Sequence, residues 1–177
     1  MPSIPITITT ATPVNHQRKL CCVLHTEFLS RQPGLCKLGE LLFGGICVGL
    51  MITYGTPVWM TLGIAYPLFL VNSSAALLFT SVSLFCYLIS EHTYRAIRTT
   101  VLEIFQNATA SVLYAVGSAF LLMHTTFFLW PMYIIIPYFQ AYPALMTAGV
   151  FGCLCSFLHA IDSYFAYKTF RSIRFTP

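Results

Sequence analysis

Four long apolar stretches, separated by short segments that hold most of the polar and charged residues, dominate the pattern along this chain of 177 residues. They occupy residues 35–55, 66–90, 101–130 and 144–167. Each is at least as long as the roughly 20 residues that an α-helix needs to cross the hydrocarbon core of a bilayer. The pattern therefore predicts an all-α integral membrane protein, built as a bundle of four transmembrane helices.

The composition supports this prediction. Hydrophobic residues make up 57% of the chain and charged residues only 8%, and the mean hydropathy is +0.76. A water-soluble domain carries about 25% charged residues, so that class is excluded. We expect a tail at residues 1–27, one membrane domain at 28–171, and the end of a short basic tail at 172–177. No nucleic-acid partner is expected.

Lysine and arginine residues tend to stay on the cytoplasmic side of short connections. Here they precede or begin the first stretch, lie between the second and third, or follow the fourth: Arg18, Lys19, Arg31, Lys37, Arg95, Arg98, Lys168, Arg171 and Arg174. Both ends of the chain are therefore expected in the cytoplasm, with outer loops near residues 56–65 and 131–143. Both tryptophans, Trp59 and Trp130, fall on this outer side, as an interfacial aromatic belt requires.

The cysteines lie within the apolar stretches or on the predicted cytoplasmic side, so we expect no disulfide in the outer loops. Cys21, Cys22 and Cys36 are candidate palmitoylation sites because they lie close to the cytoplasmic membrane surface; ordinary reduced thiols are an equally good interpretation. The glycosylation sequons at Asn72 and Asn107 lie inside predicted spans, where the modifying enzyme cannot reach them.

Small residues recur every fourth position in three of the predicted spans. In membranes such residues let helix backbones approach closely. The expected packing positions are Gly45 and Gly49 in the first span, Ser111, Ala115 and Ala119 in the third, and Ala148, Gly152, Ser156 and Ala160 in the fourth. Packing inside the protein's own bundle is the first interpretation. Contact with a second copy or with another membrane protein is the alternative.

Two acidic residues lie inside the apolar stretches, where a charge is costly and calls for a partner. At about 1.5 Å of rise per residue, Glu40 and Asp162 both lie roughly 9 Å from the middle of their spans, on the cytoplasmic side. They are therefore expected at one level. The sequence predicts a structural polar layer there, made of Lys37, Glu40, Glu103, His159, Asp162 and Lys168.

The chain contains no recognisable catalytic motif, no repeated Glu-x-x-His pattern and no phosphate loop. His124 and His159 lie at different depths, an estimated 16 Å apart, so they cannot share a haem. We expect no enzyme activity, no metal site and no cofactor. Because an intramembrane acid is a functional candidate by default, a proton- or cation-coupled channel or transporter that uses Glu40 and Asp162 stays open as an alternative.

Both ends of the apolar region resemble a MARVEL domain. FLSRQPGLCKLGELLFGGICVGLMI, residues 28–52, is similar to its opening, in which Pro-Gly leads into a glycine-rich first span with an early polar residue. AGVFGCLCSFLHAIDSYFAYKTFR, residues 148–171, is similar to its closing span, in which an acid precedes aromatic and basic residues. The short loops and tails match the compact subgroup of the chemokine-like-factor type.

This resemblance implies a non-catalytic membrane organiser in vesicle trafficking and in membrane apposition or fusion, with myoblast fusion among the examples. The implied partners are membrane lipids, including cholesterol-rich domains, and other membrane proteins or a second copy. The implied location is a vesicle or plasma membrane. An accessory subunit of a larger membrane complex is a further alternative. The uncharged outer segment PMYIIIPYFQAYP, residues 131–143, either lies among its own lipids or approaches a facing bilayer.

Overall fold

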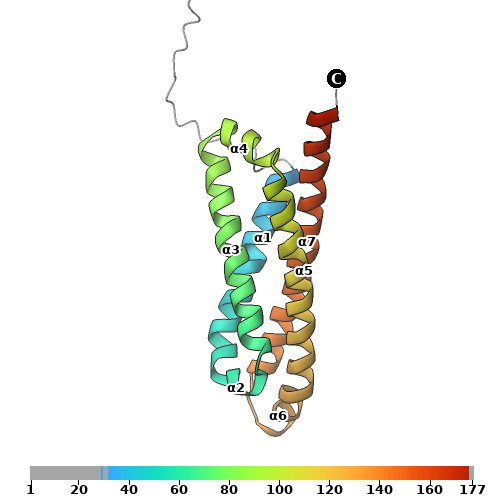
Figure 1. Cartoon of the computed structure of the whole chain (residues 1–177). Coiled ribbons are helices and arrows are strands. Elements are labelled where there is room, and N and C mark those ends of the chain that lie inside the picture. Colours follow the sequence, from blue (N-terminus) through green and yellow to red (C-terminus); the bar gives the residue numbers. More distant parts are fainter. Residues whose placement is uncertain (1–28, 30–31, 176–177) are drawn as a thin grey trace, which may run out of the picture.

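The computed structural model describes Leu29 and residues 32–175, with the side chains of 173–175 left aside. Every regular element in this part of the chain is helical, and Figure 1 shows them as one elongated bundle. The elements are α1 (Gln32–Leu50), η2 (Met51–Gly55), η3 (Thr56–Val58), α2 (Trp59–Leu62), α3 (Ala65–Ile89), α4 (Glu91–Arg98), α5 (Val101–His124), η4 (Thr125–Leu129), α6 (Trp130–Ile135) and α7 (Ala141–Phe175).

The predicted four-helix bundle is confirmed. Four helical segments are long and apolar enough to cross a membrane: Gln32–Leu62, Ala65–Ile89, Val101–Ile135 and Ala141–Ser172. Helix begins or continues in much of what the sequence assigned to outer loops, so the connections shrink to residues 63–64 and 136–140.

The connections are short because the prolines near them lie at the starts of helices, where they do not interrupt the helix. Pro57 and Pro131 lie at the start of η3 and α6, and Pro143 lies in the first turn of α7. At such positions the missing N–H would have no helical partner in any case. The first connection also needs Gly63, whose φ of 54° is a conformation that glycine adopts without strain.

The long helices follow one another around the bundle, so that α1 contacts α3 and α7, and α5 also contacts α3 and α7. The start of α1, the short helix α4 and the end of α7 lie at one end, which we call the α4 end (Figure 1). The helices α2 and α6 lie at the opposite end, which we call the tip.

The buried positions of α7 alternate between spacings of four and three residues. They are Ala141, Leu145, Ala148, Gly152, Cys155, His159, Asp162 and Ala166, and Gly149 is buried beside Ala148. This spacing is the heptad pattern of left-handed helix packing, as in four-helix bundles and coiled coils. Gly152 is the tightest point, because a Cβ added there would lie 2.3 Å from Ser118 Oγ of α5 and 2.7 Å from a ring carbon of Phe69 in α3.

The predicted packing positions divide into two groups. Ala148, Gly152 and the pair Ser111 and Ser156 do lie between helices of the bundle. The others do not and are corrected here: Gly45 and Gly49 have no neighbour within 4 Å of an added Cβ, and Ala115, Ala119 and Ala160 are exposed. A strict four-residue repeat rotates away from a face that repeats every 3.5 residues, so the outer members of each stripe turn to the surface.

Candidate functional site: a buried charged layer

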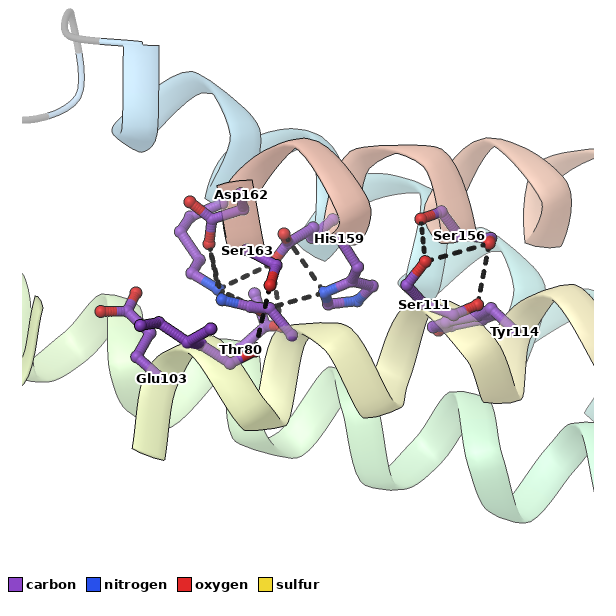
Figure 2. A network of polar contacts seen from close by, with 12 residues as sticks. Thr80, Glu103, Ser111, Tyr114, Ser156, His159, Asp162 and Ser163 are labelled. Carbon is purple, nitrogen blue, oxygen red and sulfur yellow. Dashed lines mark hydrogen bonds and ion pairs between the residues drawn. The ribbon is translucent and has the colours of Figure 1, made fainter. Parts of the chain in front are cut away.

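Six ionisable side chains meet in the core near the α4 end of the bundle, and we call them the charged layer. Figure 2 shows part of it, with Glu103, His159 and Asp162 labelled. They are Lys37 and Glu40 of α1, Arg98 of α4, Glu103 of α5, and His159 and Asp162 of α7. Each is at most 3% exposed. Charged side chains are almost never buried to this degree unless they are paired.

Lys37 is the link between three helices. Its Nζ atom lies 3.0 Å from Glu40 Oε2 and 2.8 Å from Asp162 Oδ2. It also donates a hydrogen bond of 3.0 Å to Asn107 Oδ1. A lysine ammonium group has three donors, so every one is used. The spacing of three residues places Lys37 and Glu40 on one face of α1, and the contacts with Asn107 and Asp162 then tie α1 to α5 and α7.

Arg98 closes the layer from the end of the bundle. Its Nη1 atom lies 2.8 Å from Glu103 Oε1 and 2.7 Å from Asp162 Oδ1. Burial by itself would lower the pKa of Arg98, but the carboxylates of Asp162 and Glu103 outweigh this effect, and the pKa is raised above its ordinary value. Arg98 is therefore a permanent counter-ion that ties α4 to α5 and α7.

The local structure explains how Arg98 reaches the interior. Ser90 ends α3 in an extended conformation, and its hydroxyl accepts a hydrogen bond from the backbone N–H of Thr93, which caps the start of α4. Only Thr99 and Thr100 separate the end of α4 from α5. This short connection keeps Arg98, the last residue of α4, beside the first turn of α5, where Glu103 lies.

Neutral and titratable side chains complete the layer. Asn107 Nδ2 donates to Asp162 Oδ2 at 2.9 Å, and the Thr80 hydroxyl donates to Glu40 Oε2 at 3.3 Å. His159 Nδ1 lies 3.2 Å from both Glu40 Oε1 and Asn107 Oδ1. The imidazole ring also stacks on the ring of Tyr114, with centroids 5.6 Å apart. Through Thr80, the helix α3 joins the same network as the other three long helices.

The charges in the layer compensate one another. Three carboxylates face the two cations Lys37 and Arg98, together with His159, which carries charge only when it is protonated. Within the described residues, no group of three His, Cys, Asp or Glu side chains is arranged to hold a metal ion. Removing one partner from a buried ion pair costs about 3–5 kcal/mol, because the other charge is left uncompensated. The arrangement therefore acts as a structural clamp between the helices.

Five of the six residues that the sequence assigned to the polar layer come together here, and Lys168 does not. Lys168 lies further along α7 and is exposed. Sequence reasoning missed Arg98 and Asn107. The pattern of charges assigns Arg98 to the cytoplasmic connection, and Asn107 stands out only as part of a glycosylation sequon. Two features of the sequence could have indicated them. Asn107 follows Glu103 by one helical turn, and Arg98 lies three residues before the start of the third span.

A second polar contact lies in the middle of the interface between α5 and α7. The Ser111 hydroxyl donates to the carbonyl of Ser156 at 2.9 Å, and the Ser156 hydroxyl donates to the carbonyl of Ser111 at 2.8 Å. Figure 2 shows this reciprocal pair next to Tyr114, further along the helices than the charged layer. Ser163 repeats the contact near the α4 end, where it donates to the carbonyl of Ile104 at 3.1 Å.

The candidate palmitoylation sites lie at the start of the chain. Cys21 and Cys22 fall outside the described residues. Cys36 is half-buried in the first turns of α1 and is a free thiol. Its modification stays a prediction.

Comparisons with known proteins give one informative relative. No family model matches the chain, and no solved structure matches it. The chain is 32% identical over 156 residues to a protein of Drosophila melanogaster named Protein singles bar. The match covers 88% of this chain and 89% of the relative. Similarity of this extent includes most of the helical bundle and is not confined to one or two spans.

Proposed function

Because this chain belongs to the family of the singles bar protein, we propose that it is a non-catalytic membrane organiser in vesicle trafficking and in membrane apposition or fusion. This proposal rests mainly on the 32% identity to singles bar over 88% of the chain. The resemblance of residues 28–52 and 148–171 to a compact MARVEL domain adds membrane fusion to this proposal, with myoblast fusion among the examples. Fusion between cells, with myoblasts as the first case to examine, is therefore the specific role that we propose for this chain.

The geometry supports a scaffold more than a catalyst. The acidic and basic groups of the charged layer pair with one another. The contacts of Asp162 with Lys37 and Arg98, and of Glu103 with Arg98, each join two different helices. A protein that organises membranes needs a durable bundle with an apolar exterior, and this clamp provides the durability.

Several finer statements belong to this proposal. We infer that the bundle is a MARVEL domain of the compact chemokine-like-factor and singles-bar type, on the resemblance of residues 28–52 and 148–171. Both chain ends lie in the cytoplasm by the distribution of lysine and arginine. The location is a vesicle or plasma membrane. The partners are membrane lipids, cholesterol-rich domains among them, and other membrane proteins or a second copy.

The direct test is deletion of the gene in cells that fuse, followed by counting of fused cells and of vesicles near contact sites. We expect unfused cells that still adhere, or accumulated vesicles, and rescue by the wild-type chain. Normal fusion together with normal vesicle distribution would reject the proposal. A tagged copy gives the location in the same experiment.

A proton or cation path through Glu40 and Asp162 has less support. No Asp, Glu, Lys or Arg follows Glu40 in α1, occurs in α3, follows Glu103 in α5, or precedes Asp162 in α7. A conducting path would need polar groups across the whole membrane. Reconstituted vesicles should therefore show no flux. A flux that disappears in Glu40→Gln or Asp162→Asn would favour the transporter over the organiser.

An accessory subunit of a larger complex needs a free packing surface. Phe69 and Ser118 of this chain already fill the space beside Gly152, so a partner helix cannot pack against α7 there. The pair Gly45 and Gly49, with nothing within 4 Å of an added Cβ, is the remaining candidate. If Gly49→Leu removes a co-purifying membrane protein without reducing insertion, the accessory role gains support.

A further inference from the structure

A groove runs along the bundle between α3 and α5, two helices that pack against each other. It consists of two hollows of about 340 and 190 Å³. Both hollows are lined by Phe79, Leu102 and Gln106, so they adjoin and form one groove. The smaller hollow extends to Ile97 and Thr100 at the α4 end. We call the whole feature the α3–α5 groove.

Short side chains on both helices leave this space open. The larger hollow is lined by Ala75 and Ala76 of α3 and by Thr109 and Ala110 of α5. On each helix these residues lie on the same face as the other lining residues, which recur at spacings of three and four. The lining residue Phe105 is 69% exposed, so the groove opens to the surroundings of the bundle and not to its core.

The groove has the length of one leaflet of a bilayer. Its lining on α5 runs from Leu102 to Leu113, and eleven residues of α-helix measure about 16 Å. Half of the hydrocarbon core of a bilayer is about 15 Å thick. Val101 and Leu102 are exposed apolar residues that directly follow the charged α4, so the hydrocarbon begins there. The groove therefore runs from the edge of the hydrocarbon to about the middle of the membrane.

The surroundings of the groove restrict what fills it. The hydrocarbon core holds no water, and a hollow without contents loses the packing contacts of its lining. The lining carries one charged side chain, Glu103, whose carboxylate pairs with Arg98 in the core. The remaining lining is apolar or neutral. An acyl chain of the surrounding leaflet matches the groove in both length and polarity.

Gln106 indicates which part of a lipid lies at the α4 end of the groove. Its amide makes no hydrogen bond within the described chain, and a polar group without a partner is costly in an apolar medium. Side chains of an α-helix lean toward its N-terminus, which for α5 is the α4 end (Figure 1). The amide is thus directed to the edge of the hydrocarbon, where the ester carbonyls of a phospholipid accept hydrogen bonds. An apolar helix of a second copy would leave this amide without a partner.

We propose that the α3–α5 groove binds one phospholipid of the leaflet at the α4 end. One acyl chain lies in the groove, and an ester carbonyl of the same lipid accepts a hydrogen bond from the amide of Gln106. The bound lipid then completes the wall of the bundle between α3 and α5. This inference rests on the proposed function in that membrane lipids are among its partners, and it names the lipid class and the site that holds it.

The test uses the full-length chain, reconstituted in phosphatidylcholine vesicles and then extracted with a mild detergent. Native mass spectrometry counts the lipids that each chain retains, and we expect one phosphatidylcholine on the wild type. The variant Ala75→Leu/Ala76→Leu fills the groove and should lose this lipid. The matched control is Ala115→Leu/Ala119→Leu, which adds the same atoms at two exposed alanines of α5 outside the groove. It should retain the lipid.

A second variant tests the polar contact and keeps the groove open. Gln106→Leu removes the amide with little change in size, and a net hydrogen bond of ordinary strength corresponds to about two- to tenfold weaker lipid binding. Titration of phosphatidylcholine into delipidated protein measures this change. Circular dichroism and gel filtration check that every variant is folded. For the wild type alone, a phosphatidylcholine with a photoactivatable diazirine in one acyl chain should label peptides of α3 and α5 in preference to those of α1.

Several results would overturn the inference. No retained lipid on the wild type, equal retention by the filled variant, or labelling spread evenly over the four long helices would leave only the ordinary lipid shell of a membrane protein. Cholesterol that displaces phosphatidylcholine from the protein in vesicles with equal amounts of both would assign the groove to a sterol. A dimer that is lost only in Ala75→Leu/Ala76→Leu would assign it to a second copy.

The same measurements separate this inference from the proposed function. If gene deletion blocks fusion but the filled variant retains phosphatidylcholine as the wild type does, the organiser role stands and the lipid site fails. If the deletion has no effect on membranes while the wild-type chain retains the lipid and the filled variant loses it, the proposed cellular role fails and the lipid site stands.

Discussion

The two ends of the bundle differ in where their charged and apolar side chains lie, although the same four long helices form both. Near the α4 end, six ionisable side chains lie in the core and contact one another. Around the tip, the core is apolar, with Met51, Leu62 and Leu129 among its members, and the outer surface is apolar as well. Charged residues thus lie in the core at the α4 end, and around the tip they are missing from both the core and the surface.

This difference shows which end fixes the structure and which end is available for contact. Ion pairs and hydrogen bonds are directional, so the charged layer permits one register among α1, α4, α5 and α7. Apolar contacts at the tip are less directional, and the bundle there includes the two π-helical turns η2 and η4. We therefore expect substitutions in the charged layer to change folding, and substitutions on the exposed tip to change membrane contact.

The largest effect is expected from Asp162→Asn. This change keeps the shape of the side chain but removes the carboxylate that Lys37 and Arg98 share at 2.8 and 2.7 Å. The free energy of unfolding should fall by about 3–5 kcal/mol, measured by denaturation in mixed micelles. Glu91→Gln is the matched control, because its pair with Arg95 is exposed and worth less than about 1 kcal/mol. Similar losses in both variants would mean that the buried ion pairs contribute no more to stability than the exposed pair.

A smaller but clear effect is expected from Gly152→Leu. The added side chain would collide with Phe69 and Ser118, so the helices must separate, and overpacking of this kind costs about 1–3 kcal/mol or more. Gly49→Leu is the control, since nothing lies within 4 Å of its added Cβ. Thermal unfolding of both variants in the same detergent checks this. An unaffected Gly152→Leu would contradict the close approach of α7 to α3 and α5.

The smallest effect is expected from Ser156→Ala, which removes one half of the reciprocal contact with Ser111. Hydrogen bonds between transmembrane helices contribute about 0.6 kcal/mol on average, so the stability should fall by about that amount. Ser81→Ala serves for comparison, because the Ser81 hydroxyl donates within its own helix to the carbonyl of Leu77. A loss above about 2 kcal/mol in Ser156→Ala would show that this contact rivals the charged layer.

Much of the fold could be predicted from hydropathy, because the length of an apolar helix must match the bilayer. It was harder to predict which face of each helix is buried. The regular repeat at Ala148, Gly152, Ser156 and Ala160 indicates one stripe. The left-handed packing instead buries Cys155 and His159, leaves Ser156 partly buried and turns Ala160 to the surface. Residue types alone could not reveal this, because the choice depends on which neighbours each helix meets.

The charged layer shows the same limit for polar residues. Glu40 and Asp162 could be found from the sequence, because acids inside an apolar stretch require partners. Arg98 could not be assigned so easily, because an arginine between two spans normally faces the cytoplasm. Its burial depends on the path of α4 across the end of the bundle. Thr80 gave no signal, because a threonine within a span commonly bonds its own helix.

The clamp role of the charged layer is tested most directly by a double-mutant cycle on Lys37 and Glu40, whose charged groups lie 3.0 Å apart in the core. The free energy of unfolding is measured in bicelles for the wild type, Lys37→Met, Glu40→Gln and the double variant. Each single variant should lose about 3–5 kcal/mol, and the double variant should lose less than the sum by about 1–3 kcal/mol. Losses that add within about 0.5 kcal/mol would contradict the clamp.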